Sequence, residues 1–208
     1  MKLQVALDLT SKRKALDICR KIAKHVDIIE LGTPLIKQEG LKIVKDFKQF
    51  KKPIVADLKT MDTGFLEAEL AFKAGADIST VCAAAGKETI KQAIKAARKY
   101  KGQIMVDLIG VKNVVEAAKE ASNLGANYVC VHTGIDMQHL GKTPFADLKK
   151  VSKVVPCKKL AVAGGINLEN IAKIIKFKPA IIIVGGAITK AKNPEDIALH
   201  FKNILRTS

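Results

Sequence analysis

The chain has 208 residues, of which 48% are hydrophobic and 27% are charged, and its formal net charge is +16. This length suits one domain, residues 1–208, with a substantial core, and the composition excludes a disordered chain. No apolar run is long enough to cross a bilayer, and a strand pattern begins almost at the first residue, so we expect neither a membrane anchor nor a signal peptide. The expected location is therefore the cytoplasm.

The net positive charge is compatible with more than one kind of ligand, and the cysteines show no motif. Lysines are scattered over nearly every predicted helix, and with no Trp and two Tyr the chain offers few platforms on which bases could stack. The charge therefore fits a small anionic substrate, whose local concentration it raises, as well as it fits nucleic acid. The four cysteines lie far apart without a C-x-x-C pair, which argues against a zinc or redox motif and against a disulfide framework.

In chain order, one unit repeats eight times: a short apolar run predicted as a strand, then a segment with apolar residues at helical spacing. The predicted strands cover residues 3–8, 27–31, 53–59, 78–82, 103–109, 128–133, 159–163 and 181–184. The predicted helices cover residues 12–24, part of 36–50, 65–73, 87–100, 114–124, 145–154, 168–176 and 194–205. Ser11 or Thr10 can cap the first helix and Asn193 the last, while Gly75 and Gly125 fall where a left-handed cap is needed.

The predicted strands are continuously apolar, as in Ala180-Ile181-Ile182-Ile183-Val184. Such runs are typical of a parallel sheet that is covered on both faces. Eight β/α units in one compact chain indicate an α/β protein, a single closed (β/α)₈ TIM barrel with short loops. An open doubly wound sheet is the alternative, but it usually carries a G-x-G-x-x-G fingerprint after its first strand, where this chain has Asp8-Leu9-Thr10-Ser11.

Charged residues end five of the eight predicted strands: Asp8, Glu30, Asp57 with Lys59, Asp107 and His132. The active site of a (β/α)₈ barrel lies at the C-terminal ends of its strands, and side-chain alternation directs these groups into the barrel mouth. One such residue alone is more often a structural ion pair or a cap. Four carboxylates, a lysine and a histidine on one rim indicate a catalytic site.

The excess of carboxylates predicts a metal ion. Several acids cannot all ionise at close range without a cation. Oxygen ligands suit Mg²⁺, or Mn²⁺, better than zinc, for which no cysteine or second histidine is placed. We predict that Glu30 and Asp57 bind the divalent ion, with Lys59 and Asp8 in the surrounding network.

The seventh and eighth predicted strands end in paired glycines, Gly164-Gly165 and Gly185-Gly186. Glycines let the backbone approach a ligand closely and present its N–H groups. The loops after these two strands frequently hold a phosphate in (β/α)₈ enzymes. We therefore predict a phosphorylated substrate, which also fits the basic surface.

The stretch Asp57-Leu58-Lys59-Thr60-Met61-Asp62 resembles the D-x-K-x-x-D motif of the orotidine 5′-monophosphate decarboxylase superfamily. Within it, the stretches around Asp8, Glu30 and His132 and both Gly-Gly loops are similar to those of the 3-hexulose-6-phosphate synthase family, over essentially the whole chain. The resemblance implies an Mg²⁺-dependent aldehyde-lyase of the ribulose monophosphate pathway. Its substrates would be formaldehyde and a sugar phosphate, D-ribulose 5-phosphate.

The resemblance also implies roles for the residues at the rim. A base would remove a proton from C1 of the sugar to give an ene-diolate, and His132 is the predicted base because its ordinary pKa lies near neutrality. Lys59 would stabilise the developing charge, Asp8 belongs to the same catalytic group, and Asp107 would contact the substrate. In the superfamily the second Asp of the motif reaches the site of a neighbouring subunit, so Asp62 implies a homodimer with shared active sites.

Three other functions stay open at this point. The 3-keto-L-gulonate 6-phosphate decarboxylases share these motifs, but they carry an arginine where this chain has Ile135 and a glutamate where it has Asp107, which disfavours them. Orotidine decarboxylation is disfavoured because Glu30 and His132 suit a metal-assisted ene-diolate site. A basic nucleic-acid-binding barrel without chemistry is the non-enzyme alternative, and the complete polar rim argues against it.

Overall fold

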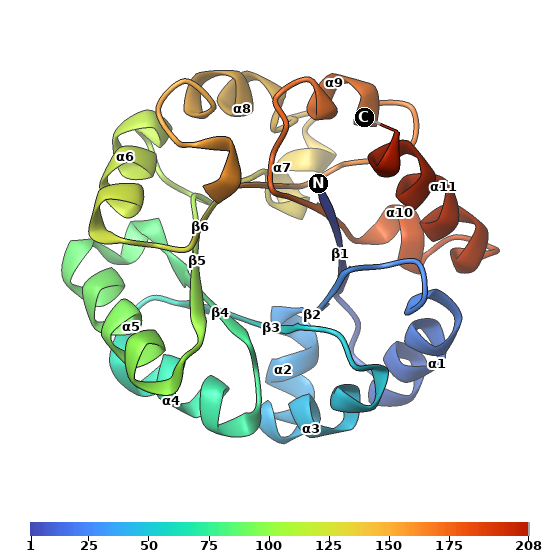
Figure 1. Cartoon of the computed structure of the whole chain (residues 1–208), viewed down its shortest axis with the longest axis horizontal. Helices are drawn as coiled ribbons and strands as arrows, with labels where there is room; N and C mark the ends of the chain where they lie inside the picture. The colour runs from blue at the N-terminus through green and yellow to red at the C-terminus, as the bar shows by residue number, and fades with distance from the viewer. Residues whose placement is uncertain (208) are drawn as a thin grey trace.

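The computed structural model describes residues 1–207 and confirms the predicted (β/α)₈ barrel (Figure 1). All neighbouring strands are parallel, and β8 pairs with β1 to close the ring. The strands are β1 Lys2–Leu7, β2 Ile28–Leu31, β3 Ile54–Thr60, β4 Ile78–Cys82, β5 Gln103–Asp107, β6 Tyr128–His132, β7 Leu160–Ala163 and β8 Ile181–Val184. The alternative of an open doubly wound sheet is therefore wrong, and the strand boundaries differ from the predicted ones by at most two residues.

The helices form an outer ring around the strands (Figure 1). They are α1 Lys12–Ile22, α2 Thr33–Glu39, α3 Val44–Phe47, α4 Gly64–Ala74, α5 Lys87–Tyr100, α6 Val114–Leu124, α7 Ile135–His139, α8 Phe145–Val151, α9 Ile171–Ile175, α10 Gly186–Thr189 and α11 Pro194–Arg206. Short 3₁₀ turns lie at Leu41–Ile43, Lys48–Phe50, Ala83–Ala85 and Cys157–Lys159. A bilayer-spanning helix is absent from residues 1–207, where the longest helix, α5, has 14 residues.

Local sequence signals explain most helix ends. The hydroxyl of Ser11 accepts a hydrogen bond from the N–H of Lys14, and Gly75 and Gly125 are left-handed C-caps, as predicted. Between residues 36 and 50 the chain does not form one helix, because Gly40 adopts a φ of +72° and ends α2 there. The short helices α7 and α10 were not predicted, since each is only a turn or so long.

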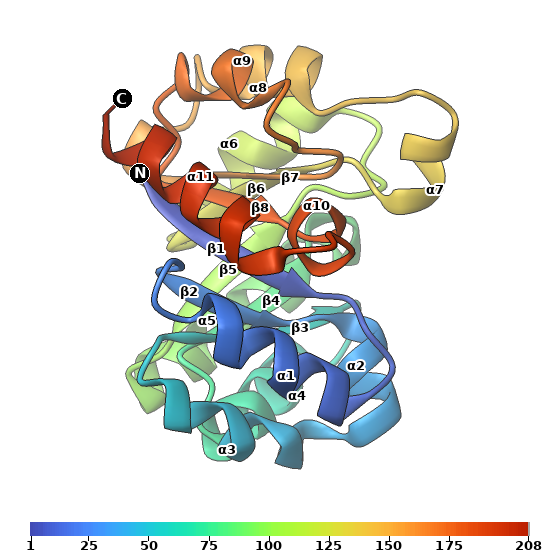
Figure 2. The same cartoon turned by 90° about the vertical axis from the view of Figure 1, so that its right-hand side faces the viewer.

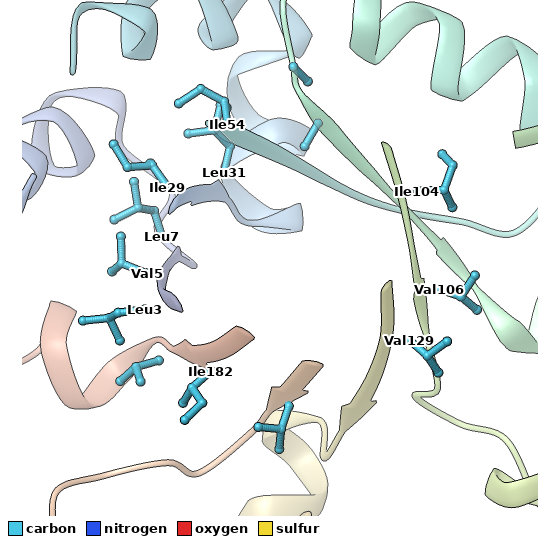
Figure 3. Packing of buried hydrophobic residues seen from close by; sticks show 14 of the residues in the cluster. Leu3, Val5, Leu7, Ile29, Leu31, Ile54, Ile104, Val106, Val129 and Ile182 are labelled. Carbon is cyan, nitrogen blue, oxygen red and sulfur yellow. The ribbon is translucent and has the colours of Figure 1, made fainter. Parts of the chain in front are cut away.

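Apolar side chains fill the molecule in two zones. Residues that point outward from the strands, such as Leu3, Val5 and Leu7, pack against the helices and are fully buried (Figure 3). Residues that point inward form a second cluster, which includes Ala6, Ile28, Val55, Ile78, Met105, Cys130, Ala161 and Ile183. The barrel interior is therefore a packed floor, and the polar groups above it are confined to the C-terminal end.

Taken two by two in chain order, the strands form the pairs β1–β2, β3–β4, β5–β6 and β7–β8. The first three pairs are each joined at the N-terminal end by the same two hydrogen bonds, which we call a base clamp. The N–H of Asp27 donates to the carbonyl of Leu3, and the carboxylate of Asp27 accepts from the N–H of Leu3, both at 2.9 Å. The same exchange links Asp77 to Ile54 and Asn127 to Ile104, at 2.8 to 3.0 Å. The clamps thus join β1 to β2, β3 to β4, and β5 to β6.

The fourth strand pair has no base clamp. The matching position is Ala180, one residue before the Ala161–Ile181 register pair, and it has no side-chain acceptor. Its N–H donates instead to the carbonyl of Cys157 at 3.0 Å. The β7–β8 pair is therefore joined at its base by one backbone hydrogen bond instead of the two of a clamp.

We expect Asn127→Ala to lower the free energy of unfolding by about 1 kcal/mol, because the buried Ile104 N–H loses its acceptor. Urea denaturation followed by circular dichroism measures this change. The control is Asn203→Ala on the exposed face of α11, which should change stability by less than about 0.5 kcal/mol. Equal stability of the two variants would contradict a stabilising role for the clamp.

Candidate active site

Polar side chains converge at the C-terminal mouth of the barrel. Figure 2 shows this end on the right, where the arrowhead of β1 points and where α7 and α10 lie. The buried polar residues that point into the barrel are Gln4, Glu30, Asp57, Thr80 and Asp107. They come from β1 to β5; Glu30, Asp57 and Asp107 belong to the predicted rim, whereas Gln4 and Thr80 do not.

A bulge at the end of β3 brings Lys59 into the mouth. The pairing of β3 with β4 shifts between Ala56 and Thr60, and Lys59 takes a left-handed φ of +46°. Thr80 holds this bulge, because its hydroxyl accepts from the N–H of Lys59 at 2.9 Å and donates to Oδ1 of Asp57 at 2.7 Å. Strained backbone of this kind is costly and is found mainly at functional sites.

Lys59 pairs with two buried carboxylates. Its Nζ lies 2.6 Å from Oδ2 of Asp57 and 3.3 Å from Oδ2 of Asp107, and both carboxylates are about 5% exposed or less. Burial lowers the pKa of Lys59, but the charges of Asp57 and Asp107 outweigh it and hold the pKa above its ordinary value. Lys59 is therefore a fixed positive charge between two strands.

His132 is oriented by Asp107. Its Nδ1 lies 2.8 Å from Oδ2 of Asp107, and the other carboxylate oxygen accepts from the N–H of Ile109 at 2.9 Å. Burial raises the pKa of Asp107, but the hydrogen bond and charge of His132 and the charge of Lys59 outweigh it and keep the pKa below its ordinary value. An ionised carboxylate only accepts hydrogen bonds, so Nδ1 donates to Asp107, and in the neutral imidazole Nε2 is the nitrogen that carries the lone pair.

Glu30 and Asp8 add negative charge beside this array. Burial, followed by the charges of Asp57 and Asp8, raises the pKa of Glu30 well above its ordinary value. The pKa of Asp8 is raised as well, first by the loss of water around its carboxyl and then by Asp57. A Cβ on Gly32 would lie 2.2 Å from Oδ1 of Asp8, so the missing side chain makes room for this carboxyl. The carboxylates are thus crowded on one side of the mouth.

This donor set fits Mg²⁺ better than a fully protein-bound metal. Within residues 1–207 no three or more His, Cys, Asp or Glu side chains are grouped to enclose an ion. Glu30 and Asp57 lie on adjacent strands, and Mg²⁺ is usually held by one or two carboxylates together with waters and substrate oxygens. Burial is the main cause of the raised pKa of Glu30, and a cation here would offset both this loss of water and the charges of Asp57 and Asp8.

The two Gly-Gly loops lie at the same end of the barrel, after β7 and β8. Gly164 has a φ of +101°, and a Cβ there would lie 2.2 Å from the carbonyl oxygen of Thr133. Gly185 precedes α10 and Gly186 begins it, so the first N–H groups of this turn have no partner within the helix. The aliphatic chain of Lys190 lies beside Gly186. Backbone donors and one cation therefore border this part of the mouth.

Asp62 does not join the mouth of its own chain. It lies in the exposed loop after β3, where its Oδ1 accepts from the N–H of Thr63 at 2.7 Å. Met61 and Leu66 beside it are 54% and 52% exposed. The other predicted catalytic and metal-binding residues all lie at the mouth, whereas Asp62 faces outward.

Two threonines of the site were missed from the sequence. Thr80 supports both Asp57 and Lys59, and the hydroxyl of Thr33 donates to the backbone carbonyl of Asp57 at 2.7 Å and to its Oδ2 at 3.0 Å. Alternation along residues 78–82 already placed Thr80 on the inner face. Thr33 is the first residue of α2, shortly after β2, and gave no such signal.

Fold and rim together define a (β/α)₈-barrel enzyme whose site combines an oriented histidine, a fixed lysine and crowded carboxylates. Comparison with known families agrees with this class. The chain belongs to the orotidine 5′-phosphate decarboxylase / HUMPS family, whose model matches residues 1–201.

The relatives of the chain narrow the comparison. A 3-hexulose-6-phosphate synthase of Bacillus subtilis (strain 168) is 42% identical over 207 residues, which is 99% of either chain. The crystal structure of a 3-hexulose-6-phosphate synthase from Salmonella typhimurium superimposes with a TM-score of 0.96 at 37% identity, covering 100% of this chain and 99% of the other. A 3-keto-L-gulonate-6-phosphate decarboxylase from Vibrio cholerae is more distant, with 30% identity, a TM-score of 0.86 and coverage of 99% and 97%.

Proposed function

We propose that this protein condenses formaldehyde with D-ribulose 5-phosphate to a 3-hexulose 6-phosphate, as an aldehyde-lyase that uses Mg²⁺. The observation that carries the proposal is the His132–Asp107 pair, which leaves Nε2 free as a base beside a fixed cation. The 42% identity to a 3-hexulose-6-phosphate synthase over nearly the full length supports the same reaction.

In the proposed reaction Nε2 of His132 takes a proton from C1 of the sugar, and C1 of the resulting ene-diolate attacks the carbon of formaldehyde. The C1–H bond breaks, a C–C bond forms, and the formaldehyde oxygen takes up a proton. Lys59 lies within reach of both Asp57 and Asp107 and stabilises the negative charge that develops between them. Mg²⁺, held by Glu30 and Asp57, would supply Lewis-acid stabilisation of the substrate oxygens.

The phosphate of the sugar is proposed to bind the Gly-Gly loops. Gly164, Gly165, Gly185 and Gly186 lie after β7 and β8, and a Cβ on Gly185 would lie 3.6 Å from Oδ2 of Asp8. Lys190 adds a positive charge there, which partly offsets the burial that raises the pKa of Asp8 and would also attract the phosphate. The reacting end of the sugar would then face His132.

The decisive experiment mixes purified protein with Mg²⁺, ribulose 5-phosphate and formaldehyde, and follows formaldehyde loss. Loss that requires the sugar phosphate and stops with a chelator is the expected result. CO₂ release from 3-keto-L-gulonate 6-phosphate without formaldehyde loss would overturn the proposal. Salt-sensitive retention of DNA or RNA without turnover of any sugar phosphate would favour the non-enzyme alternative.

The decarboxylase alternative has less support at the site. Ile135 occupies the position at which those enzymes carry an arginine, and it is 55% exposed on α7. Asp107 is one methylene shorter than their glutamate, and both of its oxygens are engaged in this structure. A side activity is the most that we propose for this reaction.

We expect the double substitution Glu30→Gln, Asp57→Asn to abolish Mg²⁺ binding, because both anionic oxygen donors are lost. Mn²⁺ titration followed by electron paramagnetic resonance measures bound metal directly, without reference to turnover. The control is Glu88→Gln, Asp196→Asn, two exposed acids on α5 and α11. Unchanged metal affinity of the site variant would show that this pair is not the ligand set.

We also propose a homodimer in which Asp62 serves the site of the partner subunit. Met61 and Leu66 flank Asp62 on an exposed apolar surface, and Leu70 lines an adjoining cavity that reaches Asp57. Surfaces of this kind mark protein–protein contacts. In a dimer, this apolar surface would be covered by the partner subunit, and Asp62 would lie near the partner's active site.

Mixing inactive Asp62→Ala and His132→Ala proteins under conditions that exchange subunits is expected to restore activity. A mixed dimer contains one site with an intact His132 and an intact Asp62 from the other subunit. Formaldehyde consumption after mixing measures the recovery, with each variant alone as the control. Subunit exchange without recovered activity would contradict shared sites.

A further inference from the structure

Gln4 lies directly under the proposed metal site. Its side chain is fully buried inside the barrel, and its Nε2 donates to Oε2 of Glu30 at 2.6 Å. In residues 1–207 this is the one hydrogen bond recorded for the Glu30 carboxylate. The strand neighbours of Gln4 in register are Ile28 and Ile183, so the surroundings below the bond are apolar.

The amide of Gln4 is only half satisfied. Its Oε1 is buried and has no hydrogen-bond partner in the described part of the chain. A buried acceptor without a partner loses the hydration it has in the unfolded chain and gains nothing in return. Gln4 is therefore a poor choice for fold stability, and an unbranched apolar side chain of similar length, such as methionine, would suit the floor better.

The one hydrogen bond recorded for the Gln4 side chain in residues 1–207 goes to Glu30. The charges of Asp57 and Asp8 repel the Glu30 carboxylate, and the floor beneath it offers no other donor. The bond from Nε2 fixes one oxygen of Glu30, and in residues 1–207 no hydrogen bond is recorded for the other oxygen. We infer that Gln4 is a positioning residue, which holds the Glu30 carboxylate in the orientation that binds the divalent cation.

This inference rests on the proposed function, because it assumes that Glu30 is a metal ligand. Partners that orient a metal ligand typically change metal affinity by about 10- to 100-fold when they are lost. Gln4 would act only through Glu30 and would not touch the sugar. Its loss should therefore weaken metal binding and leave sugar binding at saturating metal unchanged.

The test is Mn²⁺ titration of Gln4→Met, followed by electron paramagnetic resonance, together with a thermal melt. We expect the Kd for Mn²⁺ to rise by about 10- to 100-fold, with a wild-type circular dichroism spectrum and a cooperative melt. At saturating Mn²⁺, the KM for ribulose 5-phosphate should equal that of wild type. The matched control is Gln103→Met, the same exchange at the opposite end of the barrel, which should leave the Kd unchanged.

Three outcomes would overturn the inference. Equal Mn²⁺ affinity of Gln4→Met and wild type would remove the role of Gln4 but leave the proposed function standing. Loss of the wild-type circular dichroism spectrum or of the cooperative melt in Gln4→Met, together with the weaker binding, would assign Gln4 to the fold instead; Gln4→Leu, measured in parallel, would then show the same loss. A wild-type protein that binds no Mn²⁺ would end the proposed metal chemistry and, with it, the positioning role.

Discussion

Replacing His132 by alanine is expected to slow the exchange of the C1 proton of ribulose 5-phosphate with solvent by about 10²- to 10⁴-fold. The reason is geometric, since Asp107 holds Nδ1 at 2.8 Å and leaves Nε2 as the free base of the mouth. Exchange into D₂O, followed by proton magnetic resonance in the absence of formaldehyde, isolates this step from carbon–carbon bond formation.

The control for His132 is His200→Ala, which removes an exposed imidazole from α11 and should leave the exchange rate unchanged. Melting curves of both variants separate a chemical effect from a folding defect. Exchange at the wild-type rate in His132→Ala would exclude this residue as the base and would direct attention to Asp8.

Lys59→Met is expected to lower the free energy of unfolding by about 3–5 kcal/mol at neutral pH. Two buried carboxylates, those of Asp57 and Asp107, would lose their common counter-charge. Urea denaturation measures the change. Lys91→Met is the control, because its pair with Glu88 is exposed on α5 and such pairs contribute less than about 1 kcal/mol.

The pH dependence of this deficit has a defined sign. The pKa of Lys59 is raised, so its contribution is complete below the unfolded-state pKa near about 10.4 and is lost as the pH rises through the higher folded-state pKa. The pKa of Asp107 is lowered, so its contribution is present above about 3.9 and is lost as the pH falls through the lower folded-state pKa. The deficit of Lys59→Met should therefore be largest between these limits; a deficit that grows toward acid pH would contradict the ion-pair account.

Much of the fold and the rim could be predicted from the sequence because both depend on short-range patterns. Apolar runs gave the eight strands, and alternation from them placed Asp107 and His132 on the inner face, where the structure joins them. The bulge in β3 could not be predicted, because it depends on a contact with Thr80 in the next strand. The single helix expected within residues 36–50 was wrong, although Gly40 was a visible signal for its end.

The base clamps divide the barrel in a way that bears on its motions. The three clamped strand pairs carry Asp8, Glu30, Asp57, Lys59, Asp107 and His132, whereas the unclamped β7–β8 pair carries both Gly-Gly loops. Local opening is expected where stabilising bonds are fewest, and in residues 1–207 the β7–β8 quarter is the one that lacks a base clamp. Under the proposed function, this quarter would open to release the phosphate of the product while the charged array beside His132 stays assembled.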